Sequence, residues 1–318
     1  MPGSNPPRVS IALCTYNGAQ HLPQQLESLL AQDLSDVELV ACDDASTDAS
    51  FALLQRFASR FRAARIMRND INLGLTANFE RVFRECRSDW IAPCDQDDVW
   101  APNKLRRLLA QADAGGTLVY ADSLLIDADG RPFEAGRRGS RVSDSYCMIG
   151  GSDPRVFALS NCISGHSSLV RRTVLERALP LPSGVPYDAW IAFVAANLGA
   201  IRYVDEALVQ FRQHERNASG FAGQLKQGRT RSTADKWQAE LRHLEAQAAF
   251  DGPQQAFFAA LLALWQTRGD HRFTPGLAMF LNRHRSVVFA MKHTTPAAKW
   301  RHALKYLPGL KGRVGAGR

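Results

Sequence analysis

The sequence lacks any apolar run long enough to cross a bilayer. The longest unbroken run, residues 256–265, has ten residues, whereas a membrane-spanning helix needs about 18 to 20. Residues 1–8 have neither a basic start nor an apolar stretch of signal-peptide length. We therefore expect no transmembrane helix and a cytosolic protein.

Several short motifs are also missing. The six cysteines form no C-x-x-C pair and fit neither a zinc site nor a secreted disulfide framework, so we expect reduced, mostly buried thiols. No G-x-G-x-x-G follows the first predicted strand and no G-x-x-x-x-G-K-[ST] occurs, which removes the main support for dinucleotide and P-loop sites. With 45% apolar and 22% charged residues, the composition is that of an ordinary globular protein.

The positive charge lies at one end of the chain. The formal net charge is +8, but residues 1–221 hold 23 Lys plus Arg against 26 Asp plus Glu, and residues 222–318 hold 16 against 5. Small residues at 217–223 are typical of a linker between the two parts. The sequence therefore predicts a slightly acidic domain over residues 1–221 and a basic helical extension over residues 222–318.

The first region alternates strand-like and helical patterns. Strands are predicted at residues 9–14, 37–42, 64–67 and 90–94, with helices after the first three at about residues 22–30, 49–61 and 76–87. This βαβαβαβ order indicates an α/β fold with a mostly parallel sheet flanked by helices. In such sheets ligands bind at the carboxyl ends of the strands.

Polar residues follow three of these strands, at positions 15–18, 43–48 and 95–98. Carboxylates gathered on one rim of a sheet repel one another unless a cation or hydrogen-bond donors offset them. A divalent metal with hard oxygen ligands, Mg²⁺ or Mn²⁺, would do so while binding substrate phosphates. Each segment alone also fits a simpler role, as a helix-capping loop or a solvated acidic turn.

These segments together resemble the family-2 glycosyltransferases of GT-A fold. The resemblance rests on seven motifs in order: C-T-Y-N-G at 14–18, D-D-A-S-T-D at 43–48, N-L-G at 72–74, D-Q-D-D-V-W at 95–100, G-H-S-S at 165–168, Y-D-A-W at 187–190 and F-R-Q-H at 211–214. It spans roughly residues 8–220 and implies a Rossmann-like GT-A sheet. The D-Q-D-D-V-W form is similar to bacterial rhamnosyltransferases and relatives that build cell-surface polysaccharide.

The resemblance implies a role for each candidate residue. The nucleotide sugar would be bound by residues from four motifs: Thr15, Tyr16, Asn17, Asp44, Asn72, Asp95 and Gln96. Tyr16 would offer a ring face to the nucleotide, and Asp44 would accept from the pyrimidine N–H. Asp97, with Asp95 and His214, would bind the metal; His214 alternatively closes over the diphosphate or has only a structural role.

Asp188 would be the catalytic base. It would take the proton of the acceptor hydroxyl on the face opposite the diphosphate, which gives inversion. An aspartate at the start of the apolar helix that follows also fits a purely structural cap. For His166, a role in capping the segment that follows is as compatible with the sequence as a catalytic role.

The resemblance does not extend to the last 97 residues. Two patterns there, one with Leu277, Leu281 and Val288 and one with Trp300 and Leu304, place apolar side chains at helical spacing among many basic residues. Such helices fit an anionic membrane surface, which would place the protein peripherally at the inner face of the cell membrane. They also fit helices that only pack on the catalytic domain.

The leading interpretation is a metal-dependent inverting glycosyltransferase that uses a UDP-sugar or dTDP-L-rhamnose and a saccharide or lipid-linked acceptor. A sugar-phosphate nucleotidyltransferase shares the sheet type and the metal, but residues 15–20 lack its Gly-rich basic loop. A nucleic-acid binder would use the basic end, yet no recognised nucleic-acid motif is present. We therefore expect no nucleic-acid partner.

Overall fold

A computed structural model describes residues 7–133, 140–214, 233–293 and 295–310. The predicted linker at residues 217–223 lies outside these ranges. The strands are β1 (Val9–Thr15), β2 (Val37–Asp43), β3 (Ala64–Arg68), β4 (Trp90–Cys94), β5 (Val99–Trp100), β6 (Leu118–Ile126), β7 (Ser168–Arg171) and β8 (Ile201–Arg212).

The helices of the first region follow its strands. They are α1 (Leu22–Leu30), α2 (Ser50–Ala58), α3 (Leu75–Glu85), α4 (Lys104–Ala112), α5 (Arg172–Ala178) and α6 (Tyr187–Leu198). The C-terminal helices are α8 (Thr233–Ala249), α9 (Gln255–Asp270), α10 (Pro275–Arg283), α11 (Arg285–Val288) and α12 (Pro296–Leu304). No helix in the described ranges is long and apolar enough to cross a bilayer.

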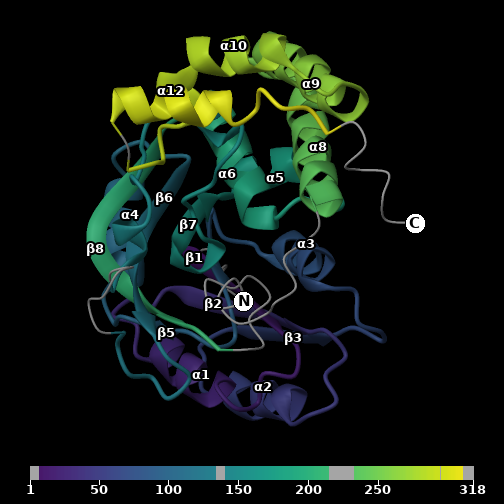
Figure 1. The fold of residues 1–318 in the computed structure, drawn as a ribbon. Helices are drawn as coiled ribbons and strands as arrows, with labels where there is room; N and C mark the ends of the chain where they lie inside the picture. The colour runs from purple at the N-terminus through teal and green to yellow at the C-terminus, as the bar shows by residue number, and fades with distance from the viewer. Residues whose placement is uncertain (1–6, 134–139, 215–232, 294, 311–318) are drawn as a thin grey trace.

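The described strands form one eight-stranded sheet of order β3-β2-β1-β4-β7-β6-β8-β5 (Figure 1). The first four strands along the chain pair in parallel, as the alternating pattern predicts. β7 then pairs antiparallel with both β4 and β6, and β5 pairs antiparallel with β8. The predicted fold class is confirmed: the sheet is mixed but mostly parallel and carries helices on both faces.

Alternate residues of β1 face different helices. Ile11 and Leu13 belong to the apolar cluster of α1, α2 and α4, whereas Ala12 and Cys14 belong to the cluster of α3, α5 and α6. This is the two-residue period of a strand buried on both faces. Because helices cover both faces of β1, its polar side chains can reach solvent only where the strand ends.

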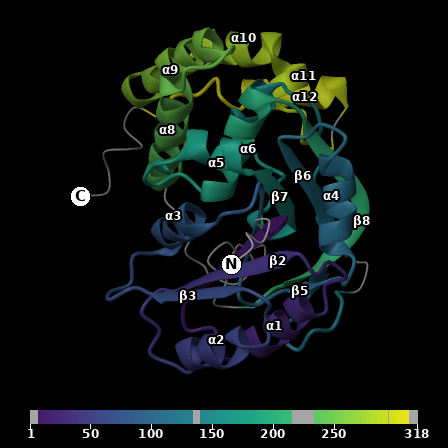
Figure 2. The same ribbon diagram turned by 180° about the vertical axis from the view of Figure 1, so that it is seen from behind.

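The C-terminal helices lie against α5 and α6, at the end of the molecule away from α1 and α2 (Figures 1 and 2). Phe193 of α6 packs edge-to-face on Phe250 and on Phe258 of α9, with ring centroids 5.5 and 5.1 Å apart. One apolar cluster therefore contains side chains from both of the regions that the charge distribution separates.

Candidate active site

A pocket of about 310 Å³ opens where β1, β2 and β4 end. It is also lined by the starts of α3 and α6, by residues 164–166 and by Phe211 of β8. A pocket at the carboxyl ends of parallel strands is the expected place for a ligand. Eight of the predicted site residues line it: Thr15, Tyr16, Asp44, Asn72, Asp95, Gln96, Asp97 and Asp188.

The turn after β1 is locked to its neighbours by hydrogen bonds. The Gln96 side chain accepts from the Tyr16 backbone N–H (2.8 Å) and donates to the Tyr16 carbonyl (3.1 Å). Asn17, which is not among the pocket-lining residues, accepts through Oδ1 from the Thr47 backbone N–H (2.8 Å). Both side chains therefore fix the shape of the rim, and the ring of Tyr16 is left exposed beside the pocket.

Asp44 is buried at the end of β2 and accepts three hydrogen bonds. The donors are the Asn69 side chain (2.6 Å) and the backbone N–H groups of Leu73 (2.8 Å) and Gly74 (2.9 Å). Asp44 thus holds the loop before α3, where Gly74 has a φ of 84°, in the left-handed region that favours glycine. A carboxylate offers about four acceptor positions, so one remains for a ligand N–H.

Asp97 follows β4 and is in contact with His214, which lies two residues after the end of β8. His214 Nε2 lies 2.8 Å from Asp97 Oδ2. His214 does not itself line the pocket, but this contact places it directly behind Asp97. The two motifs, separated by more than a hundred residues, meet because β5 pairs with β8.

Arg212 holds the loop that carries these carboxylates. Its side chain is buried and donates to the carbonyls of Asp97 (2.8 Å) and Ala128 (3.0 Å) and to Gln24 Oε1 (2.6 Å). Its backbone N–H donates to Asp98 Oδ1 (3.0 Å). The arginine therefore ties the β4–β5 loop to α1 and to the end of β6.

The fold brings Asp95 together with Asp98 and His166, a grouping that the motifs did not predict. Asp95 and His166 line the pocket, and Asp98 is buried beside them. His166 Nδ1 is 3.8 Å from both Asp95 Oδ2 and Asp98 Oδ2, and its Nε2 is 3.0 Å from the Ser123 hydroxyl. The Lys104 ammonium donates to the His166 carbonyl (2.6 Å) and lies over the Trp100 ring. Residues 95–98 and 165–168 are adjacent motifs in the resemblance, but only the fold shows that they meet.

Crowding and burial disfavour ionisation of these carboxyls. Burial, together with Asp97 and Asp188, raises the pKa of Asp95 to about 7. Burial also raises the pKa of Asp98, with Asp97 and Asp95 adding to the effect. Burial and then Lys104 lower the pKa of His166 to about 3, so its imidazole is neutral and can act as a ligand.

The donor set fits a hard divalent cation. Asp95, Asp98 and His166 each offer a ligand atom within 4.8 Å of the others. Asp98 Oδ2 is buried and finds no hydrogen-bond partner among the described residues. Carboxylate oxygens with a neutral imidazole suit Mg²⁺ or Mn²⁺. A cation there would offset both the burial and the mutual repulsion that raise the pKa values of Asp95 and Asp98.

Asp188 lies in the first turn of α6, on a different element from the other carboxylates. Its Oδ1 accepts from the Ala189 backbone N–H (2.7 Å). Burial raises its pKa to about 6, although backbone hydrogen bonds oppose the shift. The preceding Tyr187 stacks on Phe79 (4.2 Å between centroids), and a side chain at Gly165 would overlap the Tyr187 hydroxyl. The absence of a side chain at position 165 is what lets α6 begin at the pocket.

The mixed sheet and the pocket with carboxylates from three elements define a protein of GT-A fold. TarS of S. aureus in complex with UDP-GlcNAc matches 95% of this chain and 82% of its own with a TM-score of 0.60 at 17% identity. A mannosyltransferase of Pyrobaculum calidifontis, in complex with GDP-Man and Mn²⁺, matches 94% of this chain and 79% of its own with a TM-score of 0.55 at 18% identity.

The sequence model of glycosyl transferase family 2 matches residues 10–179, more than half of the chain, and the chain belongs to this family. The putative glycosyltransferase EpsE of Bacillus subtilis is 30% identical over 65% of this chain and 73% of its own. An uncharacterized glycosyltransferase of Nostoc sp. is 28% identical over 66% of each chain. The succinoglycan biosynthesis protein ExoO of Rhizobium meliloti is 35% identical over 39% of this chain and 36% of its own.

Proposed function

We propose that this protein is a metal-dependent, inverting glycosyltransferase of cell-surface polysaccharide synthesis. The observation that carries the proposal is the meeting of Asp188, from α6, with Asp95 and Asp97, from the end of β4, in one pocket. A transfer reaction needs a base for the acceptor and an electrophilic partner for the leaving diphosphate. In this pocket Asp188 of α6 would be the base, and Asp95 and Asp97 after β4 would hold the metal that serves as the electrophilic partner.

Asp188 acts as the base. Its carboxylate takes the proton of the acceptor hydroxyl while that oxygen attacks the anomeric carbon, and the bond to the diphosphate breaks on the opposite side. Burial supports this role, because a raised pKa of about 6 makes the carboxylate a better proton acceptor near neutral pH while leaving it ionised there. One displacement inverts the anomeric centre.

Asp95 and Asp97, supported by His214, would hold the divalent metal at the pocket. When bound, the metal neutralises charge that develops on the leaving diphosphate. Asp97 faces the pocket and contacts His214, whereas Asp98 is fully buried and does not line the pocket. We therefore propose the pocket-facing pair Asp95 and Asp97 as the metal site and assign Asp98, whose Oδ1 accepts from the Arg212 backbone N–H (3.0 Å), to positioning of the loop. The deeper set of Asp95, Asp98 and His166 is the competing metal site.

Tyr16, Thr15, Asp44 and Asn72 form the nucleotide side of the pocket. The remaining acceptor position on Asp44 suits the N–H of uracil or thymine. The donor is then a UDP-sugar or dTDP-L-rhamnose. Complexes of the structural neighbours with UDP-GlcNAc and with GDP-Man support a nucleoside diphosphate sugar. The acceptor is a saccharide hydroxyl, free or lipid-linked, as the similarity to ExoO, a succinoglycan biosynthesis protein, suggests.

Thermal-shift measurements with UDP, dTDP and GDP, each with Mn²⁺, Mg²⁺ or a chelator, test the site. A ligand stabilises the folded state by RT ln(1 + [L]/Kd), so a metal-dependent shift with UDP or dTDP is expected. Asp97→Ala should abolish the dependence on metal, and Asp98→Asn should leave it. If Asp98→Asn alone abolishes it, the deeper set Asp95, Asp98 and His166 holds the metal; no nucleotide response at all overturns the proposal.

A further inference from the structure

The C-terminal basic layer, residues 271–310, has a one-sided charge. It contains seven lysines and arginines and no aspartate or glutamate: Arg272, Arg283, Arg285, Lys292, Lys299, Arg301 and Lys305. Five of these side chains are exposed, and Lys292 and Lys299 are half-buried. Such a segment carries a positive potential that attracts an anionic partner.

Part of this layer is fixed to the body of the protein. Leu277 and Leu281 of α10, Val288 of α11 and Ala303 of α12 are buried in the cluster that includes α6 and α9. α10 and α12 lie side by side at the outer end of the molecule in both ribbon views (Figures 1 and 2). The layer therefore packs on the body of the protein and forms its outer surface at this end.

The outward side of α12 carries apolar side chains where a surface helix would normally carry polar ones. Ala297, Trp300, Arg301 and Leu304 follow the spacing i, i+3, i+4, i+7, so they share one face, and all four are exposed. Trp300 is 48% exposed, although tryptophan is highly buried on average in folded proteins. The indole of Trp300 therefore lies on the solvent side of α12 and not in the core.

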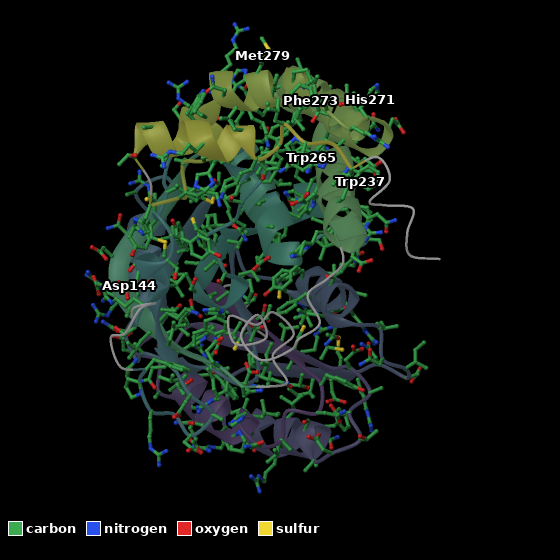
Figure 3. The ribbon with its side chains drawn as sticks, viewed as in Figure 1. Asp144, Trp237, Trp265, His271, Phe273 and Met279 are labelled. Carbon is green, nitrogen blue, oxygen red and sulfur yellow. The ribbon has the colours of Figure 1, made fainter. Side chains whose placement is uncertain are left out.

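Two more large apolar side chains of the layer are exposed. Met279 of α10 is 72% exposed and Phe273, just before α10, is 59% exposed. Figure 3 shows Met279 at the outermost edge of α10, pointing away from the body. Four of the large exposed apolar side chains of the described chain, Phe273, Met279, Trp300 and Leu304, thus lie in the segment that has no acidic residue.

This combination fits an anionic lipid bilayer better than a nucleic acid. Lysine and arginine bind lipid phosphates, tryptophan is favoured at the headgroup level, and methionine, leucine and phenylalanine gain by entering the acyl boundary. A nucleic acid would use the cations but would leave Met279 and Leu304 in water. Since no described helix can span a bilayer, the contact is with its surface.

We propose that α10 and α12 form a docking face for an anionic membrane surface. The inference goes beyond the transfer reaction and does not depend on it. Because α6 packs against α9 and begins with the residues of the pocket, docking of this layer would hold the pocket at a fixed position relative to the membrane.

Co-sedimentation of the full chain with vesicles tests the proposal. Vesicles of phosphatidylglycerol and phosphatidylethanolamine are compared with phosphatidylcholine vesicles, at low and high salt, with a chelator to exclude metal bridging through the pocket. Binding should require the anionic lipid and fall with salt. Each basic residue near an anionic surface contributes roughly a factor of five in affinity, so Arg301→Gln with Lys305→Gln should weaken binding about 25-fold.

Matched controls separate the layer from net charge and general hydrophobicity. Arg62→Gln with Arg87→Gln removes the same charge from exposed positions elsewhere and should leave binding unchanged. Trp300→Ser with Leu304→Ser should weaken binding, whereas Leu198→Ser, at a comparably exposed position of α6, should not. Equal binding to neutral vesicles, equal losses in the controls, or binding to DNA but not to anionic vesicles would each overturn the proposal. Nucleotide binding is measured separately, so its failure affects only the transfer reaction.

Discussion

At the residue scale, the protonation of Asp188 should control the rate. Its pKa is raised to about 6 by burial, so the carboxyl holds a proton below that pH and cannot accept one from the acceptor. We predict that kcat rises about tenfold per pH unit up to pH ~6 and then levels off. The measurement is the pH profile of kcat at saturating donor and acceptor.

The Asp188→Asn variant completes this test. The amide keeps the shape of the side chain but cannot take the proton, so kcat should fall by about 10² to 10⁴ while nucleotide affinity is retained. The remaining activity should have no rise near pH 6. If kcat of the variant still rises with pH up to about pH 6, another group is the base. If the variant loses nucleotide affinity as strongly as it loses kcat, Asp188 has a structural role.

Much of the candidate site could be predicted from the residues because strand ends are a local feature. The positions after β1, β2 and β4 do reach one pocket, as do Asn72 and Asp188. What those side chains contact was not predictable: the locking of Gln96 onto Tyr16, or the meeting of His166 with Asp98, depends on pairings between distant segments. Arg212 stood inside a motif, yet only the paired β5 and β8 show why an arginine is needed there.

At the element scale, Arg212 connects β8 to the loop between β4 and β5, to α1 and to the end of β6. Lysine would keep the charge but lacks the fork of donors that reaches three directions at once. We predict that Arg212→Lys destabilises the protein by about 1 to 3 kcal/mol, since at least one buried acceptor loses its partner. It should also weaken metal-dependent nucleotide binding, because the backbone of Asp97 is no longer held.

Two readouts distinguish these effects. Thermal unfolding without ligand measures the loss of stability, and the ratio of nucleotide Kd with and without Mn²⁺ measures the arrangement of the carboxylates. Gln24→Ala, which removes a single contact of the arginine on α1, serves as the milder comparison. A lower Tm with an unchanged Kd ratio would show that Arg212 supports the fold without positioning the site.

The elements themselves were predictable in the first half of the sheet and less so in the second. Strands and helices up to β4 fall within a few residues of their predicted bounds, because each βαβ unit forms from neighbouring segments. The antiparallel insertion of β7 and the two-residue β5 are set by distant partners, β6 and β8. In the C-terminal part, the first amphipathic pattern packs inward as α10 and α11, whereas the second exposes its aromatic face on α12.

At the scale of the whole molecule, charge and packing divide the chain differently. Charge separates residues 1–221 from 222–318, but one apolar cluster contains α3, α5 and α6 together with α8 to α12. We propose that the two regions have different tasks, transfer and membrane docking, and yet fold as one unit. The sequence reveals charge directly, whereas a shared core appears only when Phe193 is seen against Phe250 and Phe258.

Because the two regions share one apolar cluster, we predict that a fragment of residues 1–221 does not fold stably. It would lose the buried side chains that α8, α9 and the intervening segment contribute to the apolar cluster shared with α6: Leu244, Phe250, Phe258, Leu261 and Trp265. At about 1.5 to 3 kcal/mol for each, the loss is on the order of 10 kcal/mol, which equals the whole stability of a typical domain. We expect the fragment to aggregate or to lack a cooperative thermal transition, measured by circular dichroism and by size-exclusion chromatography.

The full chain with Arg301→Gln and Lys305→Gln, which changes the charge of the layer but not the core, should unfold like the unaltered protein. A soluble monomeric fragment with the same metal-dependent nucleotide shift would show instead that residues 1–221 are an independent domain, and that the basic region is attached to the enzyme without completing its core.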